Sequence, residues 1–165
     1  MADKLRMIAN HGQKVRYYHD MIGVNSRLDT IQAAILRVKL KSLDHYISSR
    51  VAAATFYDKA FADCADIITP ERATYATHVF HQYTMIVNRR DELVKHLQEH
   101  QVPAMIYYPV PCHMQKAFIG KGRVSGDMHH TFSLTEKVVS LPMHTELDQE
   151  QLAYITDSVL SFYNN

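Results

Sequence analysis

Apolar residues recur at a helical spacing through the first third of this chain. No glycine or proline occurs between Val24 and Thr69. Two apolar sets follow one another, each with intervals of three or four residues, as one face of a helix requires. The first set is Leu28, Ile31, Ile35 and Val38, and the second is Leu43, Ile47, Val51 and Ala54. Because the pattern is longer than an ordinary globular helix, we expect two helices with a bend near residues 41–44.

The residues before this region predict a short helix and then a loop. Leu5, Ile8 and Ala9 are spaced for one helix face, and Gly12 is expected to end that helix. Residues 13–24 are polar and aromatic, which favours a loop. Ser26 and Asp29 fit the Ser/Thr-x-x-Asp/Glu capping pattern, so we expect both to cap the helix that follows.

The second half of the chain mixes strand and helix patterns. Residues 79–87 alternate as a strand does, with one face formed by Val79, His81, Tyr83, Met85 and Val87. Asp91 is expected to cap a short helix whose inner side carries Leu93, Val94 and Leu97. Residues 104–108 predict a second strand. The expected fold class is therefore α+β, with helices packed on a small, mainly antiparallel sheet.

The remaining residues predict an irregular stretch and two more helices. Residues 109–130 hold three of the five glycines and should form a long irregular segment, which is typical of functional or disordered loops. A helix is expected over residues 131–140, and Leu141-Pro142-Met143-His144 should end it as a structural turn. Asp148 is expected to begin the last helix. Its buried stripe comprises Leu152, Ile155, Val159 and Phe162.

The composition excludes several classes of protein. The chain has 165 residues, of which 47% are apolar, and 18 basic residues nearly balance 17 acidic ones. This balance lacks the basic excess of a nucleic-acid-binding domain, and no apolar run is long enough to span a membrane. The two cysteines form neither a CxxC pair nor a disulfide framework, so we expect a cytoplasmic protein with reduced thiols. The eleven histidines show no zinc-site spacing, and the pair His129-His130 is a weak metal candidate.

Five blocks of the sequence stand out together: Ala9-Asn10-His11-Gly12, Tyr18-His19, Gly23 to Ala34 (GVNSRLDTIQAA), Tyr107 to Gln115 (YYPVPCHMQ) and Ser140-Leu141-Pro142-Met143-His144. These blocks resemble the pyridoxal phosphate-dependent sugar aminotransferases of the DegT/DnrJ/StrS family. Their order and spacing agree with the family. The resemblance implies the C-terminal small domain of a fold-type I aminotransferase. Within 1–165, residues 1–24 would be the end of the large domain and a linking loop. Residues 25–165 would be a helical connection and the small α+β domain.

The resemblance also implies that the catalytic centre lies outside this chain. In the family, the N-terminal domain carries the lysine that forms the Schiff base with pyridoxal phosphate, and this position is expected before Met1. Lys4 and Lys14 stand in the wrong sequence context for it. Because transamination needs that amine to hold the aldehyde and move a proton, we expect no catalytic residue here, and the 165-residue chain alone should be inactive.

Asn25 and Arg27 are the candidate cofactor and substrate contacts near the start of the first long helix. By resemblance, Asn25 reaches across a homodimer interface to the cofactor phosphate of the other subunit. A neutral amide at a helix start favours an anion, although Asn25 could instead only cap the helix. Arg27 could pair with a phosphate or carboxylate of the substrate. It could instead form a local ion pair with Asp29 or lie solvated on the surface.

His113 is the candidate substrate contact in the second half of the chain. It follows Pro109 and Pro111, which stiffen the loop and would present the imidazole at little entropic cost. In the family this histidine contacts the nucleotide-sugar. From the residues alone, a surface histidine on a turn is the simpler interpretation.

The expected function is that of the C-terminal part of a nucleotide-sugar aminotransferase. The parent enzyme would transfer an amino group, from glutamate as donor, to a keto nucleotide-sugar for cell-surface polysaccharides or related glycans. It would act as a homodimer that needs neither nucleic acid nor membrane. The alternative is a non-catalytic interaction or dimerisation module that keeps the family fold.

Overall fold

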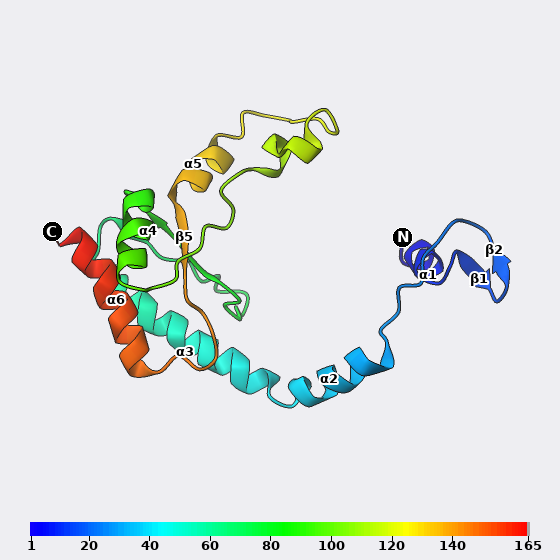
Figure 1. Ribbon diagram of the computed structural model, residues 1–165, viewed down its shortest axis with the longest axis horizontal. Coiled ribbons are helices and arrows are strands. Elements are labelled where there is room, and N and C mark those ends of the chain that lie inside the picture. The colour runs from blue at the N-terminus through cyan, green and yellow to red at the C-terminus, as the bar shows by residue number, and fades with distance from the viewer. Residues whose placement is uncertain (165) are drawn as a thin grey trace. The chain divides into compact units, whose positions relative to one another are not determined.

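The computed structural model describes residues 1–164, which divide into two compact units. The first unit is Met1–Leu43, and the second begins at Asp44. Figure 1 follows the helices and strands in chain order. Among the described residues, no helix is both long enough and apolar enough to cross a membrane.

The first unit begins with helix α1 (Ala2–Ala9) and a β-hairpin. The short helix confirms the sequence prediction. The loop predicted over residues 13–24 is wrong in part, because β1 (Gln13–Val15) and β2 (Tyr18–His19) pair antiparallel. Tyr17 takes a left-handed φ of 71° in the turn, and its N–H donates to the side chain of Gln13 at 3.2 Å. Strands this short carry no apolar alternation, so the sequence pattern misses them.

Two glycines, one before and one after the hairpin, let two backbone segments pass very close to each other. A Cβ on Gly23 would stand 2.2 Å from the backbone nitrogen of Gly12, and a Cβ on Gly12 would stand 1.7 Å from the carbonyl oxygen of Met21. Gly12 also has a φ of 77°, which glycine tolerates best. The N–H of Ser26 donates to the carbonyl of Ala9 at 2.9 Å. These contacts tie the segment before the next helix to the end of α1.

The predicted division of this region into two helices, with a break near residues 41–44, is confirmed. Helix α2 (Thr30–Leu40) ends just before α3 (Leu43–Phe61) begins. The predicted cap needs correction: Asp29 alone is the N-cap of α2, and its carboxylate accepts from the N–H of Gln32 at 2.8 Å. Ser26 lies three residues before that cap, and its backbone pairs with α1.

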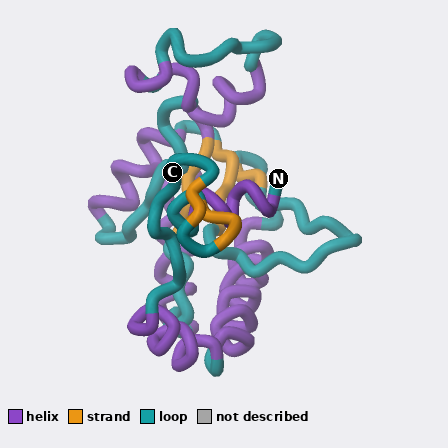
Figure 2. The backbone as a smooth tube through the Cα atoms, turned by 90° about the vertical axis from the view of Figure 1, so that its right-hand side faces the viewer, coloured by secondary structure: helices purple, strands orange, loops and turns teal. Residues whose placement is uncertain are grey.

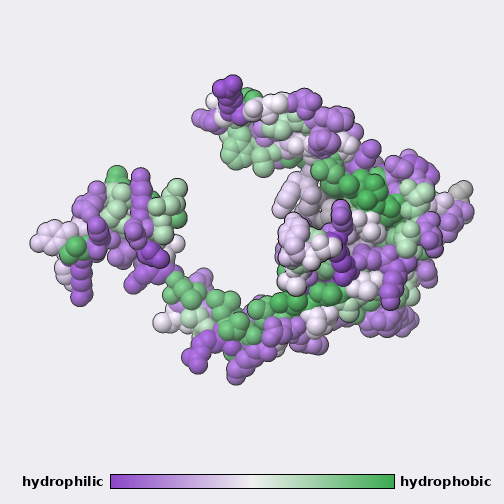
Figure 3. Space-filling view, turned by 180° about the vertical axis from the view of Figure 1, so that it is seen from behind, coloured by the Kyte–Doolittle hydropathy of each residue, from purple (hydrophilic) through white to green (hydrophobic). Residues whose placement is uncertain are grey.

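Helix α2 has no buried residue. Its apolar stripe is exposed, with exposed fractions of 74% for Ile31, 55% for Ile35 and 70% for Val38. The corresponding green, apolar side chains are visible along α2 in the space-filling view (Figure 3). The periodic pattern therefore predicts the helix correctly, but no described part of the chain covers its apolar face.

The second unit is built on a three-stranded antiparallel sheet in the order β3-β4-β5. The strands are β3 (Ile67–Ile68), β4 (Tyr83–Val87) and β5 (Val138–Leu141), drawn in orange in Figure 2. Tyr83 lies opposite Leu141 in the register. The helices of this unit are α3, α4 (Arg90–Glu99), α5 (His129–Lys137) and α6 (Gln149–Tyr163). Side chains of α3, α4, α6 and the sheet form one apolar core. This arrangement is the predicted α+β fold class.

The strand predicted over residues 79–87 is shorter in the structure. Tyr83, Met85 and Val87 are buried on one face of β4 as predicted. Phe80, however, takes a left-handed φ of 47°, and its N–H donates to Nδ1 of His78 at 2.9 Å. A local side-chain acceptor therefore replaces strand pairing there. Val79 and His81 are exposed and do not belong to the strand face.

The other predicted strand and one predicted helix also need correction. Residues 104–108 form no strand, and only Met105 pairs with another strand residue, through a bridge to Ser140. Residues 138–140 were predicted as helical but belong to β5, whose four residues are all buried. A short apolar run without periodicity fits a buried strand or a buried helix equally well, which explains this error. Helix α5 therefore runs over residues 129–137 instead of 131–140.

The helix ends confirm one predicted cap and correct another. Asp148 caps α6 through a full capping box with Gln151, as its position predicts. Asp91 is not the cap of α4: the N-cap is Arg89 with a left-handed φ of 54°, and Asp91 lies in the first turn. Leu93 and Leu97 are buried on the inner side of that helix as predicted.

Two buried tyrosines of the core have hydroxyl groups that form hydrogen bonds. The hydroxyl of Tyr83, which is fully buried, donates to Oδ1 of Asp58 at 2.7 Å, and Nε of Arg72 donates to Oδ2 of Asp58 at 2.9 Å. Burial, and then the hydrogen bond to Asp58, raise the pKa of Tyr83 well above its usual range. Burial likewise raises the pKa of Tyr57, whose hydroxyl donates to the carbonyl of Pro142 at 3.0 Å.

Candidate functional site

Asn25 and Arg27 lie together in the first unit, just before α2. Nε of Arg27 donates to Oδ1 of Asn25 at 3.1 Å, and both side chains are exposed. The cap position belongs to Asp29, so the interpretation of Asn25 as a mere helix cap is wrong. Arg27 forms no ion pair with Asp29 in the described part of the chain.

This pair presents free hydrogen-bond donors. Because Oδ1 of Asn25 already accepts, its amide NH₂ is left to donate outward, and so are the terminal nitrogens of Arg27. A neutral amide beside a guanidinium fork is a donor set that fits a phosphate or carboxylate. The crossing at Gly12 and Gly23 holds this segment in place at the end of α1. The chemistry of these donors therefore fits the phosphate of the cofactor that the sequence resemblance implies.

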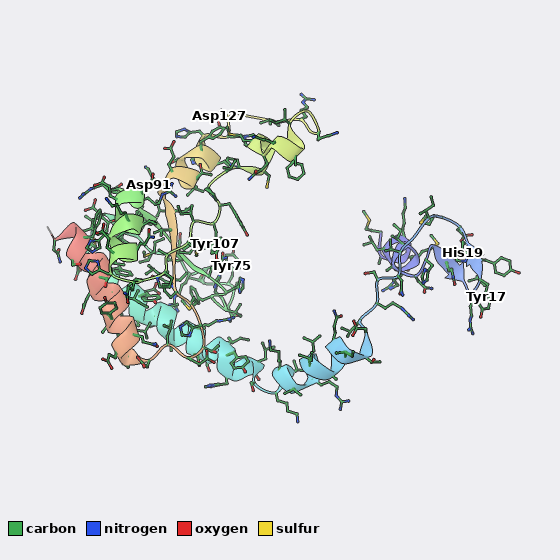
Figure 4. All side chains as sticks on the ribbon, in the orientation of Figure 1. Tyr17, His19, Tyr75, Asp91, Tyr107 and Asp127 are labelled. Carbon is green, nitrogen blue, oxygen red and sulfur yellow. The ribbon has the colours of Figure 1, made fainter. Side chains whose placement is uncertain are left out.

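Figure 4 shows Tyr17 and His19 on the neighbouring hairpin. Nδ1 of His19 bonds the carbonyl oxygen of His11 at 2.8 Å, so this imidazole supports the hairpin. Tyr17 projects its ring beside Arg16, whose guanidinium lies 4.8 Å from the ring centroid. These contacts are structural.

His113 lies in the second unit, in the irregular stretch predicted between residues 109 and 130. That stretch contains two short 3₁₀ helices, η1 (Cys112–Met114) and η2 (Lys116–Phe118). Pro111 precedes η1 with an extended backbone. The half-buried imidazole of His113 packs edge-on against the ring of Phe132 on α5, with ring centroids 5.6 Å apart. The histidine is thus held by its loop and by an aromatic neighbour.

A cavity of about 340 Å³ opens beside His113. Its wall continues from η1 through Phe118 to residues 119–124, and it includes both Lys121 and Arg123. No acidic residue occurs between Cys112 and Gly126. Asp127, labelled in Figure 4, accepts from the N–H of His129 at 3.1 Å at the start of α5. The cavity therefore combines two cations, one imidazole and one aromatic ring.

A second cavity of about 410 Å³ is also lined by Cys112. Tyr107, which Figure 4 labels, lines it together with Leu134 and Val138. This cavity contains no lysine, arginine or carboxylate. The two cavities thus differ sharply in charge while sharing one thiol.

The sequence predictions did not single out Lys121 and Arg123, which line the cavity beside His113. The signal that could have identified them is the run of residues 112–126, in which basic residues alternate with glycine and no acid balances them. The predicted site residues divide between the units: Asn25 and Arg27 belong to the first and His113 belongs to the second. In the described residues, no group of three or more histidine, cysteine or carboxylate side chains is arranged to hold a metal ion.

Comparison with known proteins explains the match of motifs and fold. Residues 1–160 match a sequence model of the DegT/DnrJ/EryC1/StrS aminotransferase family. This chain belongs to that family. It is 38% identical over its whole length to a "Pleiotropic regulatory protein" of Geobacillus stearothermophilus, of which it covers 45%. It is 36% identical over 96% of its length to the dTDP-3-amino-3,4,6-trideoxy-alpha-D-glucose transaminase of Streptomyces venezuelae, of which it covers 42%.

The fold of this family member agrees with solved structures of sugar aminotransferases. The crystal structure of DesV from S. venezuelae, in complex with a ketimine intermediate, superposes with a TM-score of 0.90 at 35% identity. The match covers 99% of this chain and 44% of DesV. The chain thus spans less than half the length of the relatives that it matches, and it has the fold of a C-terminal portion of such an enzyme.

Proposed function

We propose that this chain is the C-terminal part of a pyridoxal phosphate-dependent aminotransferase that transfers an amino group from glutamate to a keto nucleotide-sugar. The observation that carries the proposal is the family match over residues 1–160, together with the nucleotide-sugar transaminase among the relatives. The pathway would be the synthesis of a cell-surface polysaccharide or related glycan. The regulatory name of one relative leaves a non-catalytic module as the alternative that the experiments below must exclude.

The residues of this chain would bind and orient. When bound, the cofactor would supply the aldehyde that accepts the amino group and an electron sink for the proton transfer. Asn25 would donate its amide N–H to the cofactor phosphate. Arg27 would orient Asn25 through the 3.1 Å hydrogen bond and offer its terminal nitrogens to an anion. His113 contacts the nucleotide-sugar from the loop stiffened by Pro111.

The cofactor lysine would lie in the part of the full-length enzyme that corresponds to the unmatched portion of relatives such as DesV. The chain corresponds to about 44% of DesV. The 165-residue chain alone would therefore bind parts of both ligands without turning them over.

The proposal includes a homodimer in which Asn25 serves the site of the other subunit. The exposed apolar stripe of α2 supports this, because a stripe with Ile31 at 74% exposure and Val38 at 70% is costly to leave in water. Asn25 lies five residues before the start of α2. An interface along that helix would bring Asn25 close to the partner.

The first test is a half-reaction with the full-length enzyme. Purified protein that carries pyridoxal phosphate has a visible absorption band, and addition of L-glutamate alone should abolish that band as the amino group moves to the cofactor. Subsequent addition of a keto nucleotide-sugar should restore the band and yield an amino sugar detectable by mass spectrometry. A full-length protein that binds no pyridoxal phosphate would refute the enzyme assignment and support the interaction module.

The second test asks which subunit Asn25 serves. Full-length Asn25→Ala and a variant that lacks the cofactor lysine are each expected to be inactive as homodimers. When the two are co-expressed, mixed dimers contain one site with both defects and one site with neither, if Asn25 acts across the interface. Activity should then return to about half of the wild-type value per mixed dimer. If mixed dimers stay inactive while Asn25→Ala remains dimeric by light scattering, Asn25 acts within its own subunit.

A further inference from the structure

A further cavity of the second unit, of about 390 Å³, is lined by the residues that follow α4 and by the first half of α6. Val102, Leu147 and Ile155 give it apolar walls. Its volume falls within the range of about 300–1,000 Å³ that is usual for small-molecule sites. None of the residues proposed above to bind the cofactor or the nucleotide-sugar lines it.

The surroundings of this cavity are acidic. Of the described residues that line it, Glu150 is the only acidic one, and none is a lysine or an arginine. No lysine or arginine occurs after position 137, whereas four acidic residues do: Glu146, Asp148, Glu150 and Asp157. Nδ1 of His144 accepts from the N–H of Glu146 at 3.3 Å, which requires a neutral ring. The start of α6 contributes only about half a positive charge, so the carboxylates outweigh it and the cavity favours a cation.

An aromatic ring stands beside the carboxylate of Glu150. Glu150 and Tyr154 are four residues apart on α6, so both lie on one face of that helix. The hydroxyl of Tyr154 donates to the carbonyl of His100 at 2.9 Å, which holds the ring at the end of α4. Because this bond occupies the hydroxyl, the side chain offers its ring to the cavity, and the face of a tyrosine ring attracts a cation. Glu150 forms no ion pair in the part of the chain that the structure describes.

We propose that this cavity binds a small organic amine as its ammonium ion. The ammonium lies between the carboxylate of Glu150 and the ring of Tyr154, and the hydrocarbon part packs on the apolar walls. An inorganic cation would leave those walls in water, and a neutral apolar molecule would leave the carboxylate unused. An amine on a hydrocarbon body uses both. Such an amine is neither the cofactor nor the nucleotide-sugar, so the site goes beyond the proposed function.

Three other cavities of the second unit lack this combination. No carboxylate lines either of the two cavities at Cys112. The cavity of about 310 Å³ at the start of α4 contains carboxylates, but Arg89 already pairs with Glu92 there at 2.7 Å. Arg90 and Lys137 add positive charge to its wall, and no aromatic ring lines it. Charge complementarity to an ammonium thus favours the cavity at Glu150.

The test uses the full-length protein and N,N-dimethylphenethylamine, a tertiary amine that cannot condense with the cofactor aldehyde. In saturation-transfer NMR titrations, Glu150→Gln should raise the Kd of this amine about fivefold, the upper end of the range for an exposed ion pair. Asp157→Asn removes the same charge from the same helix but lies outside the cavity wall, so it should change the Kd less than about twofold. The neutral analogue 2-phenylethanol should bind the wild type more weakly than the amine does.

Two substitutions of Tyr154 separate its ring from its hydroxyl. Tyr154→Phe keeps the ring and loses the bond to His100, so the Kd of the amine should stay within about twofold of the wild-type value. Tyr154→Leu removes the ring and should raise the Kd about threefold. Circular dichroism of every variant should match the wild type, so that a loss of binding is not a loss of folding.

The binding site is overturned if the wild type binds 2-phenylethanol as tightly as the amine, or if Glu150→Gln leaves the Kd of the amine unchanged. An equal loss of affinity in Asp157→Asn would overturn it too, because the overall charge of the helix would then explain the effect. A further probe, Nα-acetyl-Nε,Nε-dimethyllysine amide, carries the same ammonium on a protein side chain. If this probe binds more tightly than dimethylphenethylamine, the cavity is a docking site for a lysine of another polypeptide and the assignment to a free amine is wrong.

Discussion

Replacing Tyr83 by Phe removes one hydroxyl from the core and leaves its packing intact. That hydroxyl donates to Asp58 at 2.7 Å inside a site where Tyr83 has no exposed surface. A hydrogen bond to a charged group contributes ~1.5–3 kcal/mol. The lower end applies because Asp58 keeps its bond from Arg72 at 2.9 Å and its side chain is 26% exposed. We expect a loss of about 1.5 kcal/mol in the free energy of unfolding, or ~3–6 °C in Tm.

The same variant should change how stability depends on alkaline pH. Burial and Asp58 raise the pKa of Tyr83 above its ordinary value of 10.0, so the folded state keeps a proton that the unfolded state loses. The contribution of this protonated hydroxyl to the free energy of unfolding is therefore complete below about pH 10. As the pH rises above that value, the contribution falls by about 1.4 kcal/mol per pH unit. Phe has no such proton. The stability gap between wild type and Tyr83→Phe should thus be full at about pH 8 and nearly closed at about pH 11.

Urea denaturation followed by far-ultraviolet circular dichroism measures both effects, and Tyr75→Phe provides the matched control. Tyr75, labelled in Figure 4, is 92% exposed, so its hydroxyl should contribute nothing measurable. A stability gap for Tyr83→Phe that stays constant from about pH 8 to pH 11 would refute the coupling between this proton and folding. A variant as stable as Tyr75→Phe at about pH 8 would refute the energetic role of the hydrogen bond to Asp58.

Three further substitutions probe other parts of the fold. Asp148→Ala removes the capping box of α6 and should cost about 1 kcal/mol in urea denaturation, whereas Asp157→Ala, exposed on the same helix, should cost almost nothing. Gly23→Ala puts a Cβ 2.2 Å from the backbone nitrogen of Gly12, so amide hydrogen exchange around the end of α1 should accelerate. In Gly122→Ala the new Cβ meets nothing within 4 Å, so exchange should stay unchanged. Leu93→Ala empties a fully buried position and should lower the free energy of unfolding by ~2–5 kcal/mol, and a loss below about 1 kcal/mol would contradict the packing described for α4.

The periodic parts of the sequence predict the fold well, because helix faces and caps are local. The stripes at Leu28 to Val38 and Leu43 to Ala54 correspond to α2 and α3, and Asp148 marks the start of α6. The errors fall where distant residues decide the structure. Val138 to Ser140 become a strand because β4 pairs with them from more than fifty residues away, and residues 104–108 lose their predicted strand because only Met105 finds a partner. No local pattern encodes either pairing.

In the candidate site too, residues in local motifs were predicted, and residues that depend on the folded structure were not. Asn25, Arg27 and His113 were predicted because they stand in motifs, and the structure adds their local partners: Asn25 bonds Arg27, and His113 packs against Phe132. Lys121 and Arg123 stand in no motif. They line one cavity with Cys112, His113 and Phe118, and which residues share a cavity wall cannot be deduced from spacing alone.

Cys112 is placed where a fluorescent label could report on ligand binding. Its thiol is exposed and lines both the charged cavity and the apolar cavity beside it, whereas Cys64 is half-buried in the core. A thiol-reactive fluorophore should therefore label residue 112 first. The emission of that label should change when a ligand enters either of the two cavities. One covalent modification could therefore be used to follow two kinds of ligand.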